Sequence, residues 1–327
     1  MTILDKLFRR NRSTDDAGRS DYTRGLDYDR LVAEEMAEFD NHPMTEDLKL
    51  GGVHDTQAWH YYWRRLGAEE FAGWRHPSVV HFIEEERQFD APVKVLSLGS
   101  GFCGPDLDLA RAFRVPYEIT CVDMNPKLFA GARECADREK LNVRFEEGDL
   151  NYITLPPGSY HLVFAHAILH HVINIERLFD QILQTLKPGG ICHFVEVGGQ
   201  NRDLISDQAT KFANALLQLQ PRDLGKSPKI ERTPEGGMEG IRQDRLLPLI
   251  EQYFQPIYEV RHGAFMRFVC HASSVGLLNP EIPREKQWLD FLIDVDRSCV
   301  KRGLLPPLEI WGVYSPRKKN TENDPDA

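Results

Sequence analysis

Three glycines, Gly99, Gly101 and Gly104, form the most informative chemical pattern in the sequence. An apolar run broken by one lysine, residues 93–98, leads into this Gly-x-Gly-x-x-Gly motif, and a helical pattern begins at Asp106. A strand, a glycine turn and a helix N-terminus in that order form a cradle for a nucleotide cofactor. The first glycine permits the turn, the second lets the backbone approach the ligand, and the third lets the helix pack on the strand. The motif alone does not identify the cofactor.

A carboxylate ends the next β-rich run, residues 117–123. Asp123 lies about 20 residues after the glycine turn, where a strand-end acid accepts hydrogen bonds from ribose hydroxyls. A carboxylate suits this task because its two oxygens can accept from a diol. An alternative role as a helix cap is weaker, since Asn125 and Pro126 already supply a helix start.

Three histidines, His166, His170 and His171, lie at and just after the end of the fourth predicted strand. Imidazole titrates near neutral pH and is the usual general base. We expect one of them to act as a base, with His170 ahead of the other two; the alternative is a structural or cofactor-contact role. Glu196 ends the fifth predicted strand, where it would orient such a histidine, bind substrate or form an ordinary salt bridge.

The chain repeats a strand–helix unit that positions these residues. Apolar strand patterns alternate with helical patterns, and the five strands are expected at residues 93–98, 117–123, 143–149, 160–166 and 191–197. This series predicts an α/β fold with a doubly wound, mostly parallel sheet and right-handed crossovers. A short strand at residues 257–260 and a last strand at 308–314 bring the sheet to seven strands.

The remaining segments define the domain organisation. We expect disordered tails over residues 1–25 and 316–327, a helical cap over residues 26–90 and the cofactor-binding domain over residues 91–315. Residues 198–237 follow the fifth strand with polar and Gly/Pro-rich ends around a helical pattern, and we expect this insertion to form a lid.

Aromatic residues are concentrated in the cap, Trp59 and Tyr62 among them. Large aromatic side chains are usually buried, so these residues pack against the sheet domain in one interpretation. In the other they line a pocket, where Trp59 and Tyr62 bind substrate. Both interpretations stay open.

Composition excludes several classes of function. A formal net charge of −10 argues against a nucleic-acid partner, which requires clustered Lys and Arg. The six cysteines include no Cys-x-x-Cys pair and indicate a reducing, cytoplasmic location. No apolar run approaches the roughly 18–20 residues of a membrane span, and no local carboxylate–histidine spacing indicates a metal site. Oligomeric state is not indicated.

The motifs together resemble the class I S-adenosylmethionine-dependent methyltransferases over roughly residues 90–315. Dehydrogenases that bind NAD share the glycine turn and the acid, so the resemblance depends on three further features. These are the Gly-Asp-Leu sequence at residues 148–150, the Leu-Lys-Pro-Gly-Gly sequence at 186–190, and the terminal strand, which in this family lies antiparallel beside the fifth.

The resemblance implies S-adenosylmethionine as cofactor and a role for each motif residue. The glycine turn approaches the methionine part, Asp123 binds the ribose, Met124 lies against the purine, and the remaining expected contacts are Ser100, Gly104, Asp149, Leu150 and His166. Asp149 has an alternative role as a turn residue after Gly148. One position departs from the family: an acid that helps hold the cofactor's ammonium group is often found where this chain has Ser97.

The acceptor is suggested only by residues 237–250, which resemble a segment of bacterial methyltransferases associated with glycan biosynthesis. We therefore expect methyl transfer to a hydroxyl of a small molecule or glycan, with a histidine base. N-methylation of a small metabolite and an inactive cofactor-binding scaffold are the alternatives. Arg242 would bind an anionic substrate group or else pair with a surface acid.

Overall fold

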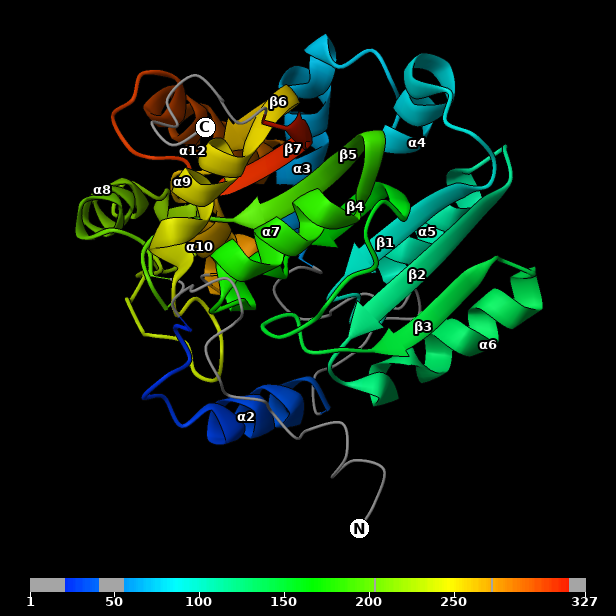
Figure 1. The fold of residues 1–327 in the computed structure, drawn as a ribbon. Helices are drawn as coiled ribbons and strands as arrows, with labels where there is room; N and C mark the ends of the chain where they lie inside the picture. Colours follow the sequence, from blue (N-terminus) through cyan, green and yellow to red (C-terminus); the bar gives the residue numbers. More distant parts are fainter. Residues whose placement is uncertain (1–20, 41–55, 203, 272, 318–327) are drawn as a thin grey trace, which may run out of the picture.

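The computed structural model describes residues 21–40, 56–202, 204–271 and 273–317, and these residues contain one seven-stranded sheet (Figure 1). The strand order is β3-β2-β1-β4-β5-β7-β6. The strands are β1 (Val93–Leu98), β2 (Tyr117–Asp123), β3 (Val143–Glu147), β4 (Tyr160–His166), β5 (Leu186–Val197), β6 (Phe254–His262) and β7 (Glu309–Pro316).

The strand directions confirm the predicted fold. Strands β1 to β5 pair in parallel, whereas β7 is antiparallel to both β5 and β6. Parallel neighbours bring their carboxyl ends to one edge of the sheet, so the residues that follow β1, β2, β4 and β5 meet there.

Alternate strand residues pack into apolar layers on the two faces of the sheet. Val95 and Leu162 belong to the layer that includes α5 (Gly104–Ala112), α6 (Phe129–Glu139) and the short α4 (Val79–Phe82). Their neighbours Leu96 and Val163 belong to the opposite layer, with α7 (Ile175–Thr185) and α9 (Gln243–Tyr253). Burial on both faces explains why these strands are continuously apolar in the sequence.

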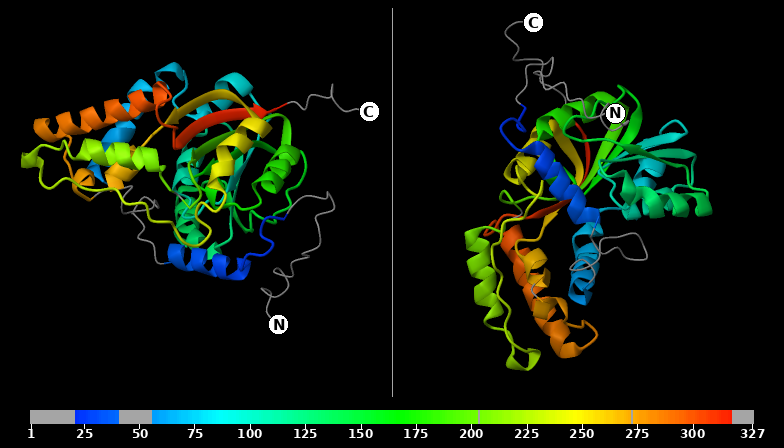
Figure 2. Two further views of the ribbon diagram at one scale, coloured as in Figure 1. Left: turned by 90° about the vertical axis from the view of Figure 1, so that its left-hand side faces the viewer. Right: turned by 90° about the horizontal axis from the view of Figure 1, so that it is seen from below.

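A helical lobe extends beside the β6–β7 edge and has its own apolar core. It contains α3 (Gln57–Glu69), α8 (Asp207–Leu217), α10 (Met266–His271), α11 (Ser273–Gly276) and α12 (Pro283–Lys301). Both views of Figure 2 show α8 and α12 side by side in this lobe.

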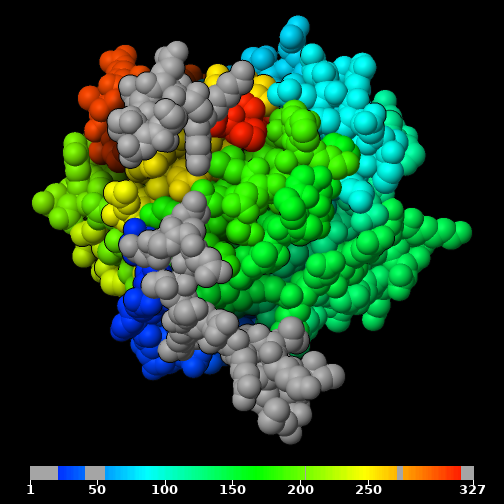
Figure 3. Space-filling view, viewed as in Figure 1, coloured from blue at the N-terminus to red at the C-terminus, as the bar shows by residue number. Residues whose placement is uncertain are grey.

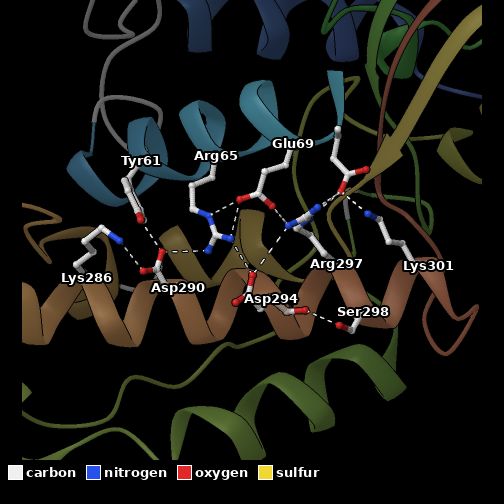
Figure 4. Close-up of polar contacts among 10 residues, drawn as sticks. Tyr61, Arg65, Glu69, Lys286, Asp290, Asp294, Arg297, Ser298 and Lys301 are labelled. Carbon is white, nitrogen blue, oxygen red and sulfur yellow. Dashed lines mark hydrogen bonds and ion pairs between the residues drawn. The ribbon is translucent and has the colours of Figure 1, made fainter. Parts of the chain in front are cut away.

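Ion pairs join α3 to α12 along the surface of the lobe (Figure 4). Arg65 of α3 lies 3.0 Å from an Asp290 oxygen and 2.9 Å from an Asp294 oxygen. Arg297 of α12 pairs in return with Glu69 and Glu70. The contacts cross in both directions and add to the packing of α3 in the apolar core of the lobe.

The predicted cap of residues 26–90 is therefore divided among three places. Helix α3 belongs to the lobe, α4 packs on the sheet, and α2 (Tyr28–Asp40) lies across the carboxyl ends of the strands (Figure 2). Figure 3 shows the blue surface of α2 meeting the yellow-green surface of the segment that precedes α9. A hydrogen bond joins them there, since the Met238 backbone amide donates to the Glu35 side-chain oxygen Oε2 at 3.0 Å.

Several predicted boundaries differ from the structure. Strand β5 begins at Leu186, five residues before the expected start, and β6 is longer than expected because it pairs along β7. Of the two predicted tails, residues 1–20 and 318–327 lie outside the described residues. Residues 21–25 form a turn instead of a tail, and the Tyr22 amide donates to Asn174 Oδ1 at 2.9 Å.

The insertion at residues 198–237 mainly contributes α8 to the lobe. The insertion leaves the strand edge directly after β5 and returns to it at its end, where Glu235 lines the cavity. Within the part of the chain that the structure describes, no helix is both long and apolar enough to cross a membrane.

Candidate active site

A cavity of about 690 Å³ lies at the carboxyl ends of β1, β2, β4 and β5. Most of the predicted site residues line it: Gly99, Ser100, Gly101, Gly104, Asp123, Met124, Leu150, His166, His170, His171, Glu196 and Trp59. The exceptions are Tyr62, Asp149 and Arg242, which lie outside the lining. The sequence motifs thus converge on one cavity, and the N-terminal helix α2 forms part of its wall.

The glycine turn needs glycine at Gly99 for two reasons. Its φ of +56° is in the left-handed region, and a Cβ there would lie 1.8 Å from Cγ1 of Ile168. Gly101 also has a positive φ, of +51°, but a Cβ would meet nothing within 4 Å. The backbone therefore passes very close to the histidine-containing turn at the first glycine, while the second faces open space.

Asp123 is fixed at the end of β2 by two backbone amides. Gly101 N–H donates to Oδ2 and Asn125 N–H donates to Oδ1, each at 2.9 Å. Burial raises the pKa of this carboxyl, and the two amide bonds oppose that rise. Each oxygen keeps a lone pair that can accept from a ligand in the cavity.

Asp149 takes part in a network with α2 and does not line the cavity. Tyr28 donates its hydroxyl to the two Asp149 oxygens, both at 2.9 Å, and the Asn151 amide donates to one of them. Asn151 in turn donates through Nδ2 to the Tyr28 hydroxyl at 2.9 Å. Asp149 thus holds α2 over the cavity. Its neighbour Leu150, together with Met124, contributes apolar surface to the cavity lining.

Ser97 lies beside an acid that the sequence motifs did not identify. The Ser97 hydroxyl donates to the carboxylate of Asp106, in the first turn of α5, and both residues are buried and line the cavity. Among the described residues, Asp106 Oδ1 has no hydrogen-bond partner. Burial raises the pKa of Asp106 to about 7, although the Ser97 bond opposes the rise. The only sequence signal was an acid two positions after Gly104.

The histidine turn is organised by Glu196. One oxygen of Glu196 accepts from the Ile168 and Leu169 amides at 2.8 and 2.7 Å, and the other contacts His170 Nδ1 at 2.9 Å. Burial acts to raise the pKa of Glu196, but its bonds to His170 and the amides bring it below the usual value. Of the roles expected for Glu196, orienting a histidine is the one that matches this geometry.

Two further carboxylates surround the histidine pair, and neither was identified from the sequence. Glu35 of α2 lies 2.6 Å from His171 Nδ1. Glu239 lies 3.2 Å from His170 Nε2 and 2.9 Å from His171 Nε2. Burial acts against protonation of His170, yet the nearby carboxylates of Glu239 and Glu196 raise its pKa to about 9.

These contacts argue against the general-base role expected for His170 and His171. A base must be neutral and must have a ring nitrogen directed at its substrate, but both nitrogens of each ring face carboxylates. His166 is exposed at the end of β4 and lines the cavity, whereas His170 and His171 are buried. Among the three histidines, the geometry favours His166.

The structure also corrects two expected substrate contacts. Tyr62 is fully buried, and its hydroxyl lies 3.0 Å from His262 Nδ1. Arg242 forms a bidentate ion pair with Glu176, with both N–O distances 2.7 Å, and its guanidinium lies 3.6 Å from the centre of the Tyr22 ring. Arg242 therefore pairs with an acid of the protein itself, which is the alternative to substrate binding given above.

The side of the cavity next to the helical lobe has a mixed aromatic and charged lining. Trp59 and Trp63 of α3 line it, together with His262, Arg267 and Glu309. His262 lies 3.5 Å from a Glu309 oxygen, and Arg267 lies 3.7 Å from the other. Burial lowers the pKa of His262 to about 3, so this imidazole is neutral.

Comparison with known proteins identifies the central part of the chain. Residues 95–190 match the family described as methyltransferase domain. A sterol 24-C-methyltransferase of Aspergillus fumigatus is 26% identical over 113 residues, which cover 34% of this chain and 29% of that protein. An arsenite methyltransferase of Halobacterium salinarum is 33% identical over 98 residues, covering 29% and 25%.

The matched segment thus spans less than a third of the length of either relative. Among solved structures, an S-adenosylmethionine-dependent methyltransferase of Mesorhizobium loti aligns over 81% of this chain and all of its own, with 17% identity and a TM-score of 0.42. The family match covers the glycine turn, Asp123 and the histidine turn, and the strand order with antiparallel β7 is typical of the same family. The chain therefore contains a class I S-adenosylmethionine-dependent methyltransferase domain.

Proposed function

We propose that this protein transfers the methyl group of S-adenosylmethionine to a hydroxyl oxygen of a small molecule or glycan, with His166 as general base. The observation that carries the proposal is the exposed imidazole of His166, which shares one cavity with the glycine turn and Asp123. When bound, the cofactor supplies a methyl group activated by a sulfonium charge, so the protein needs only to position and deprotonate the acceptor.

The cavity residues fit the cofactor at three points. The Asp106 oxygen without a hydrogen-bond partner among the described residues suits the ammonium group, and Asp106 thereby replaces the acid missing at Ser97. The Asp123 oxygens suit the ribose diol. Met124 and Leu150 offer apolar contact to the purine, while Asp149 acts indirectly by holding Tyr28.

The acceptor would occupy the part of the cavity nearest the helical lobe. Trp59 and Trp63 present flat apolar faces, and Arg267 and Glu309 present polar groups that can bind hydroxyls. This combination suits a polyhydroxylated ring. His166 ends β4 and lines the same cavity as the glycine turn, which supports a role for its imidazole beside a bound acceptor. It would accept the hydroxyl proton as the oxygen attacks the methyl carbon.

A methyl-donor assay with glycans, hydroxylated metabolites and amines tests the proposal. We expect a hydroxyl acceptor to be methylated and His166→Gln to lower single-turnover rates by about 10²–10⁴-fold with cofactor affinity retained, the range usual for a general base. His60→Gln is the control, since His60 is exposed on α3 and is not part of the lining. Equal rates for wild type and His166→Gln would remove His166 from the base role, and methylation of amines alone would support the N-methyl alternative.

A further inference from the structure

Two imidazoles and one carboxylate converge beside the cavity. His170 and His171 come from the turn η5 (Leu169–His171), and Glu239 comes from the segment between α8 and α9. The Nε2 atoms of the two histidines each face a different oxygen of Glu239, at 3.2 and 2.9 Å. One ligand atom from each residue lies within 4.8 Å of the other two. This spacing allows a single metal ion to bind all three.

Each imidazole is oriented through its other nitrogen by a separate carboxylate. His170 Nδ1 lies 2.9 Å from Glu196, and His171 Nδ1 lies 2.6 Å from Glu35. Histidines that bind metals are usually held in this way, because a carboxylate at one nitrogen fixes the tautomer and leaves the other nitrogen as the ligand. Glu196 is itself anchored by the Ile168 and Leu169 amides.

The charge of the cluster also favours a cation. Three carboxylates, Glu35, Glu196 and Glu239, surround the two imidazoles, and Asp123 lies close enough to interact with His171. Glu35, Glu196 and both histidines are buried. Buried carboxylates require compensating positive charge, and a bound divalent ion would supply it in place of the protons that the imidazoles release on binding the ion.

We propose that His170, His171 and Glu239 bind one first-row divalent transition-metal ion. Two imidazoles and a carboxylate form a ligand set that such ions accept while keeping coordination positions open. All three residues line the cofactor cavity, so a ligand in the cavity could occupy an open coordination position of the ion. An ion there would polarise an acceptor oxygen and lower the pKa of its hydroxyl. Ion binding does not depend on the proposed methyl transfer and can be measured without an acceptor.

Glu239 offers the most direct variant because it is the least buried of the three ligands. The experiment uses tag-free, full-length protein stripped with a chelator and titrated with Co²⁺, followed by visible absorption, and with Zn²⁺, followed by calorimetry. We expect one ion per chain. Glu239→Gln and His171→Asn should each bind at least about 10-fold more weakly, and Glu35→Gln about 10–100-fold more weakly through loss of the orienting carboxylate.

Glu231→Gln is the matched control, since Glu231 is an exposed carboxylate of the same segment that pairs with Lys229. Circular dichroism establishes that each variant is folded. If His171→Asn is unfolded, the affinity of Glu239→Gln and the Co²⁺ spectrum of the wild type still test the site, because Co²⁺ bound by imidazole and carboxylate gives visible d–d bands. Wild-type protein without saturable binding, or Glu239→Gln with wild-type affinity, would overturn the proposal and leave the methyl-transfer proposal unaffected.

Discussion

Replacing Gly99 with alanine tests how closely the glycine turn approaches the histidine turn. Two costs add at this position: the left-handed backbone costs an alanine about 1–2 kcal/mol, and forcing a methyl group into occupied space costs about 1–3 kcal/mol. The clash is with Ile168, whose Cγ1 would lie 1.8 Å from the new Cβ. We therefore expect Gly99→Ala to lower the free energy of unfolding by about 2–5 kcal/mol.

Gly101→Ala is the matched control for the backbone cost alone. Its φ is nearly the same, but the added Cβ meets nothing within 4 Å, so a loss of about 1–2 kcal/mol is expected. Chemical denaturation of both variants measures the difference. In an Ile168→Ala background, Gly99→Ala should cost less than in the wild-type background, because the two nearest clashing atoms, Cγ1 and Cδ1 of Ile168, are gone and only its Cβ remains, at 2.8 Å. Equal destabilisation by the two alanine variants in the wild-type background would refute the close approach.

Two further predictions concern Asp106, which the sequence motifs did not identify, and Arg242, which was considered as a substrate contact. Burial raises the pKa of Asp106 to about 7. Between about pH 4 and 7 the folded state therefore holds more protons than the unfolded state. We expect the free energy of unfolding of the wild type to fall as pH rises through this window, compared with that of Asp106→Asn. S-adenosylmethionine affinity should rise between pH 6 and 8 in the wild type only; parallel pH profiles of wild type and Asp106→Asn would contradict this. Arg242→Ala should lose about 1–3 kcal/mol in chemical denaturation, since Glu176 loses a charged hydrogen-bond partner. Its acceptor KM should not change, and a rise in KM at unchanged stability would instead support substrate binding by Arg242.

The strands were predictable where burial on both faces made the sequence continuously apolar. Strands β1, β2 and β4 begin and end at the expected residues. Strand β6 was underestimated because its length depends on pairing with β7, which no local pattern shows. The sequence predicts neither α10 nor α11, since both helices are short and are stabilised by packing in the lobe.

The cofactor side of the cavity was predictable because its motifs are contiguous in the sequence. Gly99 and Asp123 are recognisable from the strand, turn and helix around them. By contrast, Glu35 and Glu239 lie in segments distant from the histidine turn, and no local pattern connects them with it. The ion pair that removes Arg242 from the cavity was hidden for the same reason, since Glu176 is on another helix.

Calorimetric titration with S-adenosylhomocysteine tests most directly whether the cavity binds the methyl-donor cofactor. We expect saturable binding of one molecule per chain, no binding of NAD, and at least about tenfold weaker binding by Asp123→Ala, because a hydrogen bond to a charged group contributes about 1.5–3 kcal/mol. Failure of the wild-type protein to bind S-adenosylhomocysteine, or equal affinity in Asp123→Ala, would contradict the assignment of the cavity.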